Sequence, residues 1–240
     1  MAEKKLKKIL PRALYRKLIG IKRNILGEHA EKSYSQEGED MVLRKIFEGK
    51  KKGFYVDVGA YHPKRFSNTY YFYRKGWRGI NIDAMPESMK SFRRVRGEDI
   101  NLETPISDKP ETLTYYAFDE PALNGFDKEI SEARLKEKEN VLLFKKEIRT
   151  KTLKEILEQN LPQGTEIDFL SVDVEGMDLK VLSSNDWTKY IPKIILIETI
   201  GANIENDGAS EIAKFLSDKG YALFSKTFYT RIYKHKSFIL

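Results

Sequence analysis

The sequence has no cysteine, and this absence excludes several kinds of chemistry. Disulfide frameworks, zinc–thiolate sites, iron–sulfur clusters and thiol nucleophiles all require that side chain. Long apolar runs are also missing, since segments such as 194–197 are far too short to span a bilayer. The first residues lack the apolar stretch and cleavage site of a signal peptide. We therefore expect a soluble, cytoplasmic, globular protein.

Acidic residues are almost absent from the first 27 positions, although the whole chain is only moderately basic. This segment holds nine lysines and arginines against the single acid Glu3, so its local charge is +8. The total is +7, which leaves the rest of the chain at −1. The high isoelectric point therefore belongs to an N-terminal arm, residues 1–30, and residues 31–240 form one nearly neutral domain.

The arm has the apolar spacing of a helix. Leucine or isoleucine stands at positions 10, 14, 18, 21 and 25, and Pro11 suits a first helical turn. We expect a basic amphipathic helix over 11–26. Such a helix can bind an anionic membrane surface from the cytoplasmic side, or it can dock on its own domain. The rest of the chain shows no basic stripe interleaved with aromatic residues, so a nucleic-acid partner is not expected.

Apolar and polar segments alternate through residues 31–240. Short apolar runs predict buried strands, and periodic segments between them predict helices. Expected strands are 53–58, 78–82, 101–106, 167–172 and 193–197, then a final pair at 221–225 and 230–234. Expected helices are 39–47, 68–75, 86–95, 152–159, 179–182 and 209–219. The pieces 111–118 and 144–150 read as extended, and polar residues 119–140 as a lid or substrate-binding insertion. This order predicts an α/β fold with a mostly parallel, doubly wound sheet.

Four of the predicted strands end in acids, namely Asp57, Asp83, Asp173 and Glu198. In an open parallel sheet, ligands bind beyond the carboxyl ends of the strands. The acids therefore predict a rim of carboxylates around a polar ligand. Each acid could also serve only as a loop or helix cap.

The first strand and loop favour a nucleoside ligand. Gly59 permits close backbone approach, and an acid at Asp83 can accept both ribose hydroxyls. The loop has one glycine and lacks the G-x-G-x-x-G pattern that places a pyrophosphate on a helix N-terminus. No P-loop pattern occurs either. An adenosine cofactor without pyrophosphate fits best, and S-adenosylmethionine is the obvious one.

Several blocks of residues together resemble the FkbM-type methyltransferases, within the Rossmann-like class I fold of S-adenosylmethionine-dependent enzymes. The resemblance covers roughly residues 33–200. The blocks are 34–40 (YSQEGED), 56–60 (VDVGA), 67–69 (SNT), 76–79 (GWRG), 106–108 (ISD), 122–124 (ALN) and 168–176 (DFLSVDVEG). The block at 168–176 is the most specific of them.

The resemblance implies where the cofactor lies. Residues Asp57, Gly59 and Ala60 would face its methionine part, and Asp83 its ribose, where many relatives have a glutamate. The remaining implied cofactor contacts are Ser107 and Asp108 near the adenine, with Gln36 and Glu39 closing over the cofactor.

The resemblance also suggests which acidic residues could take part in methyl transfer. Some class I O-methyltransferases hold Mg²⁺ at the strand ends that Asp173 and Glu198 occupy, and oxygen ligands suit that ion. Without a metal, Asp173 or Glu175 could act as general base. Both could also merely order their loop. Independently of the resemblance, His62 lies just beyond the glycine loop, so it could contact cofactor or substrate, act as a base, or be only a turn residue before Pro63.

We expect a methyltransferase that modifies an oxygen of a sugar, nucleotide-sugar or other glycoconjugate precursor in polysaccharide biosynthesis. Asn124 is the candidate substrate contact, or alternatively a turn residue before Gly125. Nucleic-acid or protein methylation is the alternative activity, although the Asn-Pro-Pro-Tyr type of motif after the fourth strand is lacking. A non-catalytic membrane-surface binding module is the third hypothesis.

Overall fold

The computed structural model describes residues 11–26, 30–120, 123–137, 139–174, 176–198 and 210–240. The chain divides into two compact units, Met1–Ser33 and Tyr34–Leu240. The first unit contains helix α2 (Arg12–Leu26), which matches the helix expected for the arm. Among the described helices, none is long and apolar enough to cross a membrane.

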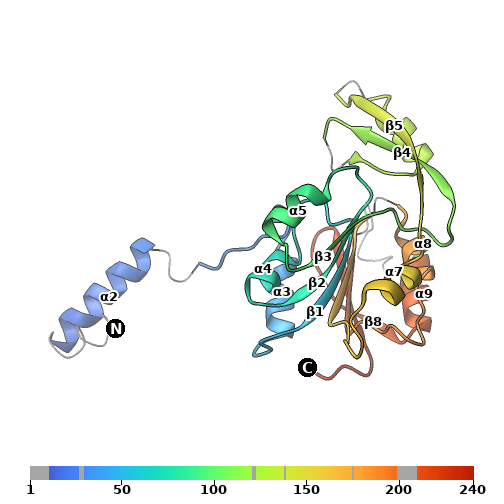
Figure 1. Cartoon of the computed structure of the whole chain (residues 1–240). Helices are drawn as coiled ribbons and strands as arrows, with labels where there is room; N and C mark the ends of the chain where they lie inside the picture. Colours follow the sequence, from blue (N-terminus) through green and yellow to red (C-terminus); the bar gives the residue numbers. More distant parts are fainter. Residues whose placement is uncertain (1–10, 27–29, 121–122, 138, 175, 199–209) are drawn as a thin grey trace. The chain divides into compact units, whose positions relative to one another are not determined.

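The second unit is built on a seven-stranded sheet with the order β3-β2-β1-β6-β7-β9-β8 (Figure 1). The first five strands in this order are parallel, and β9 and β8 are antiparallel additions. The expected doubly wound, Rossmann-like sheet with a final antiparallel pair is thereby confirmed. The strands are β1 (Phe54–Val58), β2 (Arg78–Asp83), β3 (Ile100–Glu103), β6 (Phe169–Val172), β7 (Ile194–Glu198), β8 (Tyr221–Lys226) and β9 (Thr230–His235).

Helices cover both faces of this sheet, because alternate side chains of each strand point to opposite faces. Val56 and Val58 of β1 pack into one apolar cluster with residues of α7, α8 and α9. Tyr55 packs into a second cluster with residues of α3 and α4. The helices are α3 (Glu39–Ile46), α4 (Tyr70–Arg74), α5 (Met89–Val95), α7 (Leu153–Asn160), α8 (Asp178–Ser183) and α9 (Glu211–Asp218).

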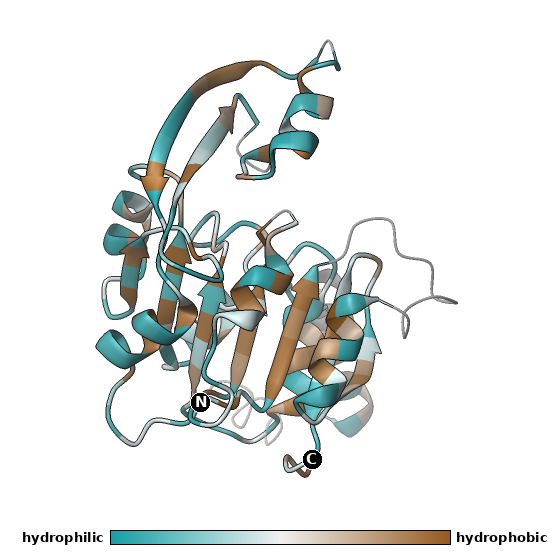
Figure 2. Ribbon diagram, turned by 90° about the vertical axis from the view of Figure 1, so that its right-hand side faces the viewer, coloured by the Kyte–Doolittle hydropathy of each residue, from teal (hydrophilic) through white to brown (hydrophobic). Residues whose placement is uncertain are grey.

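A separate antiparallel hairpin lies beyond the carboxyl ends of the parallel strands (Figure 2). It pairs β4 (Thr112–Phe118) with β5 (Leu142–Arg149), and α6 (Lys128–Arg134) lies in the connection between them. The sequence indicated two extended pieces and an irregular insertion, but not that the pieces pair or that the insertion contains a helix. The pairing is antiparallel over non-neighbouring residues, which a local sequence pattern cannot reveal.

The observed boundaries differ from the expected ones at a few ends. Helix α5 begins at Met89, because Met85–Ser88 forms a turn in which the Ser88 amide donates to the Met85 carbonyl. Pro86 therefore precedes the helix by a turn. Strand β3 ends at Glu103 instead of continuing to Ile106. Ile106 makes only an isolated bridge to Lys151, where the chain leaves the sheet for the hairpin.

Candidate functional site

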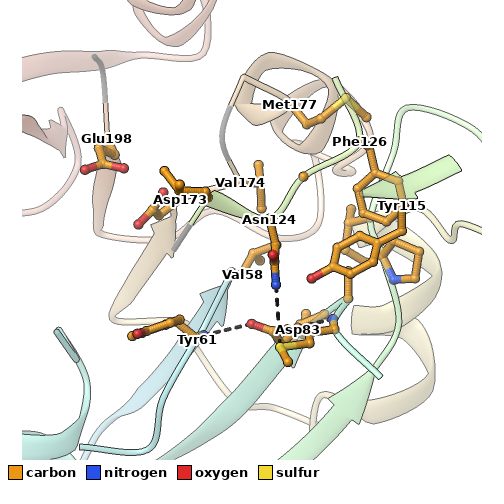
Figure 3. A pocket seen from close by; sticks show the side chains of 18 of the residues that line it. Val58, Tyr61, Asp83, Tyr115, Asn124, Phe126, Asp173, Val174, Met177 and Glu198 are labelled. Carbon is orange, nitrogen blue, oxygen red and sulfur yellow. Dashed lines mark hydrogen bonds between the residues drawn. The ribbon is translucent and has the colours of Figure 1, made fainter. Parts of the chain in front are cut away.

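A cavity of about 390 Å³ opens at the carboxyl end of the parallel sheet, within the size range of small-molecule sites. Its floor comes from the ends of β1, β2, β6 and β7, and the hairpin supplies the opposite wall (Figure 3). Among the residues expected to act in function, six line it: Gln36, Gly59, Asp83, Asn124, Asp173 and Glu198. The doubly wound sheet therefore gathers residues far apart in sequence, as expected from its topology.

Gly59 lets the loops after β1 and β6 come into contact. Its φ is +83°, a left-handed conformation that favours glycine, and a Cβ built there would lie 1.7 Å from the Asp173 carbonyl oxygen. The Asp173 amide donates to the Val58 carbonyl at 3.0 Å. A glycine is thus required at this position so that the two loops can come into contact. Its lack of a side chain also lets a ligand approach the backbone closely.

Asp83 ends β2 and faces the cavity, half-buried. Its two carboxylate oxygens accept the backbone amides of Tyr61 and Met85, each at 2.8 Å. Burial raises the pKa of this carboxyl above its ordinary value, and the two amides oppose that shift. A carboxylate has about four lone-pair sites, so Asp83 can still accept from a ligand's hydroxyls.

Asp57 does not line the cavity, because the pleat of β1 turns its side chain to the same face as Tyr55. It is buried, and its carboxylate accepts a hydrogen bond from Thr69 Oγ1 at 2.7 Å. Burial raises its pKa, whereas the charge of Arg96 lowers it. Asp57 therefore lies beneath the site, where it anchors the chain that follows the β1 loop.

A network of buried polar groups extends from Asp57, and sequence reasoning missed it. Arg96 donates to Thr69 Oγ1, Tyr55 Oη and Asp99 Oδ2, each at 2.9 Å. Both members of the Arg96–Asp99 ion pair are fully buried. Asp99 also accepts from the Gly79 amide at 3.0 Å. The network links β1, β2 and the α5–β3 turn, and no local motif marks it.

Three other expected cofactor contacts also lie away from the cavity lining. Ala60 packs with Met89 and Phe92 in a small buried cluster. The Ser107 hydroxyl donates to Asp108 and to Glu111, and Asp108 is exposed. The chain turns at this point from β3 toward the hairpin, so Thr104, Pro105 and Ile106 reach the cavity instead.

His62 is also outside the lining, and its contacts fit the turn alternative. Its Nδ1 accepts the amides of Lys64 and Arg65 at 3.1 and 3.0 Å. When Nδ1 accepts in a neutral imidazole, Nε2 carries the proton, so the ring offers no free basic nitrogen. Desolvation, Arg65 and Lys64 lower the pKa of His62, which favours this neutral form.

Asp173 and Glu198 meet at one end of the cavity. Val172 pairs with Ile197 in the parallel ladder, so the two acids follow at matching positions on neighbouring strands. Both line the cavity and a small adjoining hollow, and Figure 3 shows them side by side. Glu175 lies outside the described residues. No group of three or more metal-ligating side chains occurs among the residues that the structure describes.

Gln36 and Glu39 approach from the chain before β1. Gln36 lines the cavity and the adjoining hollow, whereas Glu39 is almost fully buried and lines only the hollow. Glu39 accepts from the Thr230 hydroxyl at 2.9 Å and from the Glu37 amide at 2.9 Å. It therefore ties the start of α3 to β9, and Gln36 has the more direct access to a ligand.

The hairpin contributes aromatic residues that no sequence motif marks as functional. Tyr115 and Phe126 pack with ring centroids 5.1 Å apart, and both line the cavity (Figure 3). Asn124 accepts the Phe118 amide at 2.7 Å, and Gly125 pairs with Tyr116 through two backbone hydrogen bonds. Asn124 is thus both a turn residue and part of the wall.

Comparison with known proteins gives a family match and several distant structural likenesses. A model described as the methyltransferase FkbM domain matches residues 57–223. A TehB-like SAM-dependent methyltransferase from Corynebacterium glutamicum is 11% identical, with a TM-score of 0.43 over 94% of this chain and 100% of that one. An O-methyltransferase from Bacillus cereus in complex with SAH is 9% identical, with a TM-score of 0.37 over 97% and 95%. No curated protein matches the chain.

Proposed function

We propose that this chain, which belongs to the FkbM methyltransferase family, binds S-adenosylmethionine in the cavity and methylates an oxygen of a sugar, nucleotide-sugar or related glycoconjugate precursor. The observation that carries the proposal is the convergence of Gly59, Asp83, Asp173 and Glu198 on one cavity. These four residues do not identify the acceptor, so the sugar class rests on the family resemblance.

The cavity fits the cofactor at its two ends. Asp83 would accept the ribose hydroxyls, while the backbone at Gly59 would approach the methionine part closely. The apolar side chains of Met85 and Ile106 line the same cavity as Asp83 and would cover the adenine. A cavity of about 390 Å³ is small for cofactor and acceptor together, so the acceptor would extend to the mouth.

The acids at the other end suit methyl transfer to oxygen. Bound S-adenosylmethionine supplies a methyl group on a sulfonium, which leaves as a neutral thioether when the acceptor oxygen attacks. Asp173 would hold the acceptor hydroxyl in line and take its proton. In the alternative role, Asp173 and Glu198 would both ligate Mg²⁺, which is commonly bound by one or two carboxylates together with water. The ion would favour the deprotonated oxygen.

The variant Asp173→Asn tests these roles, because it keeps the side chain's shape and removes its charge. Turnover should fall by about two or more decades, with affinity for S-adenosylhomocysteine little changed. The control Asp218→Asn changes an exposed acid at the end of α9 and should leave turnover unaltered. Loss of activity with a chelator and recovery with Mg²⁺ would identify the metal role. Unaltered turnover in Asp173→Asn would exclude both roles.

Methylation of nucleic acid or protein is the alternative activity, and a purely binding role is the third. Mass spectrometry of reactions with sugar, nucleotide-sugar, RNA, DNA and peptide acceptors distinguishes them by a mass gain of about 14 Da. A gain only on RNA, DNA or peptide would replace the sugar proposal. No gain on any acceptor, despite tight cofactor binding, would favour the binding role.

We also propose that the arm binds an anionic membrane surface at the cytoplasmic face. Helix α2 contains no acid, and Leu14, Leu18 and Ile21 are exposed on it at helical spacing. Full-length protein should float with vesicles containing phosphatidylglycerol but not with phosphatidylcholine alone, and added salt should weaken binding. Leu18→Asp should abolish flotation, whereas Leu223→Asp, at an exposed leucine of β8, should not. Equal flotation of both variants would contradict this role.

A further inference from the structure

The loop that follows β1 has an unusual backbone at the mouth of the cavity. Tyr61 and Phe66 both have a φ of 53°, in the left-handed region that bulky side chains rarely adopt. Both residues line the cavity, and Phe66 is 42% exposed. Strained residues of this kind cluster at binding sites, where the surrounding structure holds them in place. We call residues 61–66 the rim loop.

The strain brings two aromatic rings and a guanidinium together. The rings of Tyr61 and Phe66 stack with centroids 6.2 Å apart and planes 18° from parallel. The Arg65 guanidinium lies 4.4 Å from the Phe66 centroid and donates to Tyr61 Oη at 3.2 Å. The ring and the phenol thus hold an otherwise flexible cation in one place.

The two cations of the rim loop have no acidic partner among the described residues. Neither Lys64 nor Arg65 forms an ion pair within the described part of the chain. A guanidinium carries five N–H donors, and only one of those of Arg65 has an acceptor among the described residues. Glu120 of the hairpin acts instead on the Tyr61 phenol, whose pKa is raised by burial and by that carboxylate. The free donors therefore remain available to a ligand.

The backbone of the rim loop is fixed by His62. Its Nδ1 accepts the amides of both Lys64 and Arg65, so the two cationic residues follow a closed turn. The acids of the cavity, Asp83, Asp173 and Glu198, lie deeper, at the strand ends. Arg65 is exposed and does not itself line the cavity, but it lies against Tyr61 and Phe66, which do. Among the described residues, the cation on the lining itself is Arg134 of α6, on the hairpin side.

We propose that the rim loop is an acceptor subsite, in which Arg65 binds an oxyanion of the acceptor while Phe66 and Tyr61 contact its ring. This inference rests on the proposed methyltransferase function and narrows its substrate to an anionic sugar, one carrying a phosphate ester or a carboxylate. A guanidinium matches both groups through paired N–H donors. Binding the anion at the mouth would leave a neutral hydroxyl to reach Asp173.

The experiment uses the full-length chain saturated with S-adenosylhomocysteine, whose binding is measured first by calorimetry. Three probes share one sugar ring: glucose 1-phosphate, glucuronate and methyl glucoside. Each is titrated while the Nε–H resonance of Arg65 is followed by NMR. Arg65→Gln removes the charge, and Arg93→Gln is the matched control on the exposed surface of α5.

We expect one of the anionic probes to bind at least tenfold more tightly than methyl glucoside and to shift the Arg65 resonance. The probe that does so identifies the phosphate or the carboxylate as the source. Arg65→Gln should abolish this preference without changing affinity for S-adenosylhomocysteine, and Arg93→Gln should retain it. Equal binding of the three probes, or the same loss in Arg93→Gln, would overturn the subsite.

A weakened affinity of Arg65→Gln for S-adenosylhomocysteine would place the arginine on the cofactor's carboxylate, and would also overturn the proposal. If the unmodified chain binds no S-adenosylhomocysteine, the proposed function itself fails. Phe66→Gly provides an independent check, since glycine suits a φ of 53°. Its melting temperature should not fall, while the response of Arg65 to the anion should weaken at least threefold. An unchanged response would refute the role of the ring.

Discussion

The substitution Gly59→Ala should separate the β1 loop from the β6 loop and thereby damage cofactor binding. The added Cβ would lie 1.7 Å from the Asp173 carbonyl oxygen and 2.7 Å from its carbonyl carbon. Both are backbone atoms, so no side-chain rotation can relieve the overlap. The loop that carries Asp173 must move, or the β1 loop must, and each forms part of the cavity floor.

The expected loss in the free energy of unfolding of Gly59→Ala has two contributions. A Cβ in the left-handed region costs about 1–2 kcal/mol. Overpacking against fixed atoms adds about 1–3 kcal/mol, so the free energy of unfolding should fall by about 2–5 kcal/mol in all. Gly49→Ala isolates the first term, because Gly49 has the same φ of +83° and nothing within 4 Å of a built Cβ. That control should lose only about 1–2 kcal/mol.

Urea denaturation measures both losses, and calorimetry with S-adenosylhomocysteine measures the effect on the site. We expect Gly59→Ala to weaken cofactor binding at least tenfold, and Gly49→Ala to leave it unchanged. If the two variants lose equal stability and bind the cofactor equally well, the contact between the β1 and β6 loops does not shape the site.

Three further predictions concern buried or titrating groups. Arg96→Met leaves the buried Asp99 carboxylate without its cation and should lower the free energy of unfolding by about 3–5 kcal/mol; a loss below about 1 kcal/mol in urea denaturation would contradict this. Burial raises the pKa of Asp178 to about 6, so ionisation disfavours the folded state, and stability should fall by up to about 3 kcal/mol as pH rises from about 4 to 6. Asp178→Asn should flatten that part of the pH profile; an unchanged slope would refute the assignment. Protonation of His62 removes the Nδ1 acceptor, so the protection factors of the Lys64 and Arg65 amides, which correct for the intrinsic pH dependence of exchange, should fall as the pH drops through the lowered pKa of His62. His62→Asn, which keeps an acceptor, should not show this change, and a similar change in that variant would contradict it.

The sheet was predictable from the sequence because its strands are short apolar runs with acids at their ends. Asp83, Asp173 and Glu198 line the cavity because they follow the last residues of their strands. Asp57 differs because it lies within β1, one residue before the strand ends at Val58. The pleat turns it away from the cavity, and a sequence pattern accurate to a residue or two does not distinguish the two outcomes.

The pairing within the hairpin could not be predicted from the sequence. Residues 111–118 and 144–150 were expected to be extended, but their pairing depends on contacts between segments some thirty positions apart. Tyr115 and Phe126 come to the cavity only through that pairing. The Arg96–Asp99 pair is hidden for a similar reason, since a charged residue near a helix end is usually read as exposed.

The same limit applies to His62 and the rim loop. The sequence marks His62 as a single histidine after the glycine loop, a position equally suited to a base or a turn. Only the hydrogen bonds that Nδ1 accepts from two backbone amides distinguish the turn residue from the base. The left-handed conformations of Tyr61 and Phe66 carry no sequence signal, because neither residue type favours that region.

Calorimetric titration of the full-length protein with S-adenosylhomocysteine and, separately, with NAD measures which nucleoside cofactor the cavity binds. We expect binding of S-adenosylhomocysteine at one site per chain and much weaker binding of NAD, because the β1 loop has one glycine and no pyrophosphate cradle. Asp83→Ala should weaken the S-adenosylhomocysteine complex by about one to two decades, the scale of a hydrogen bond to a charged group. Tighter binding of NAD, or an Asp83→Ala variant with unaltered affinity, would contradict the account.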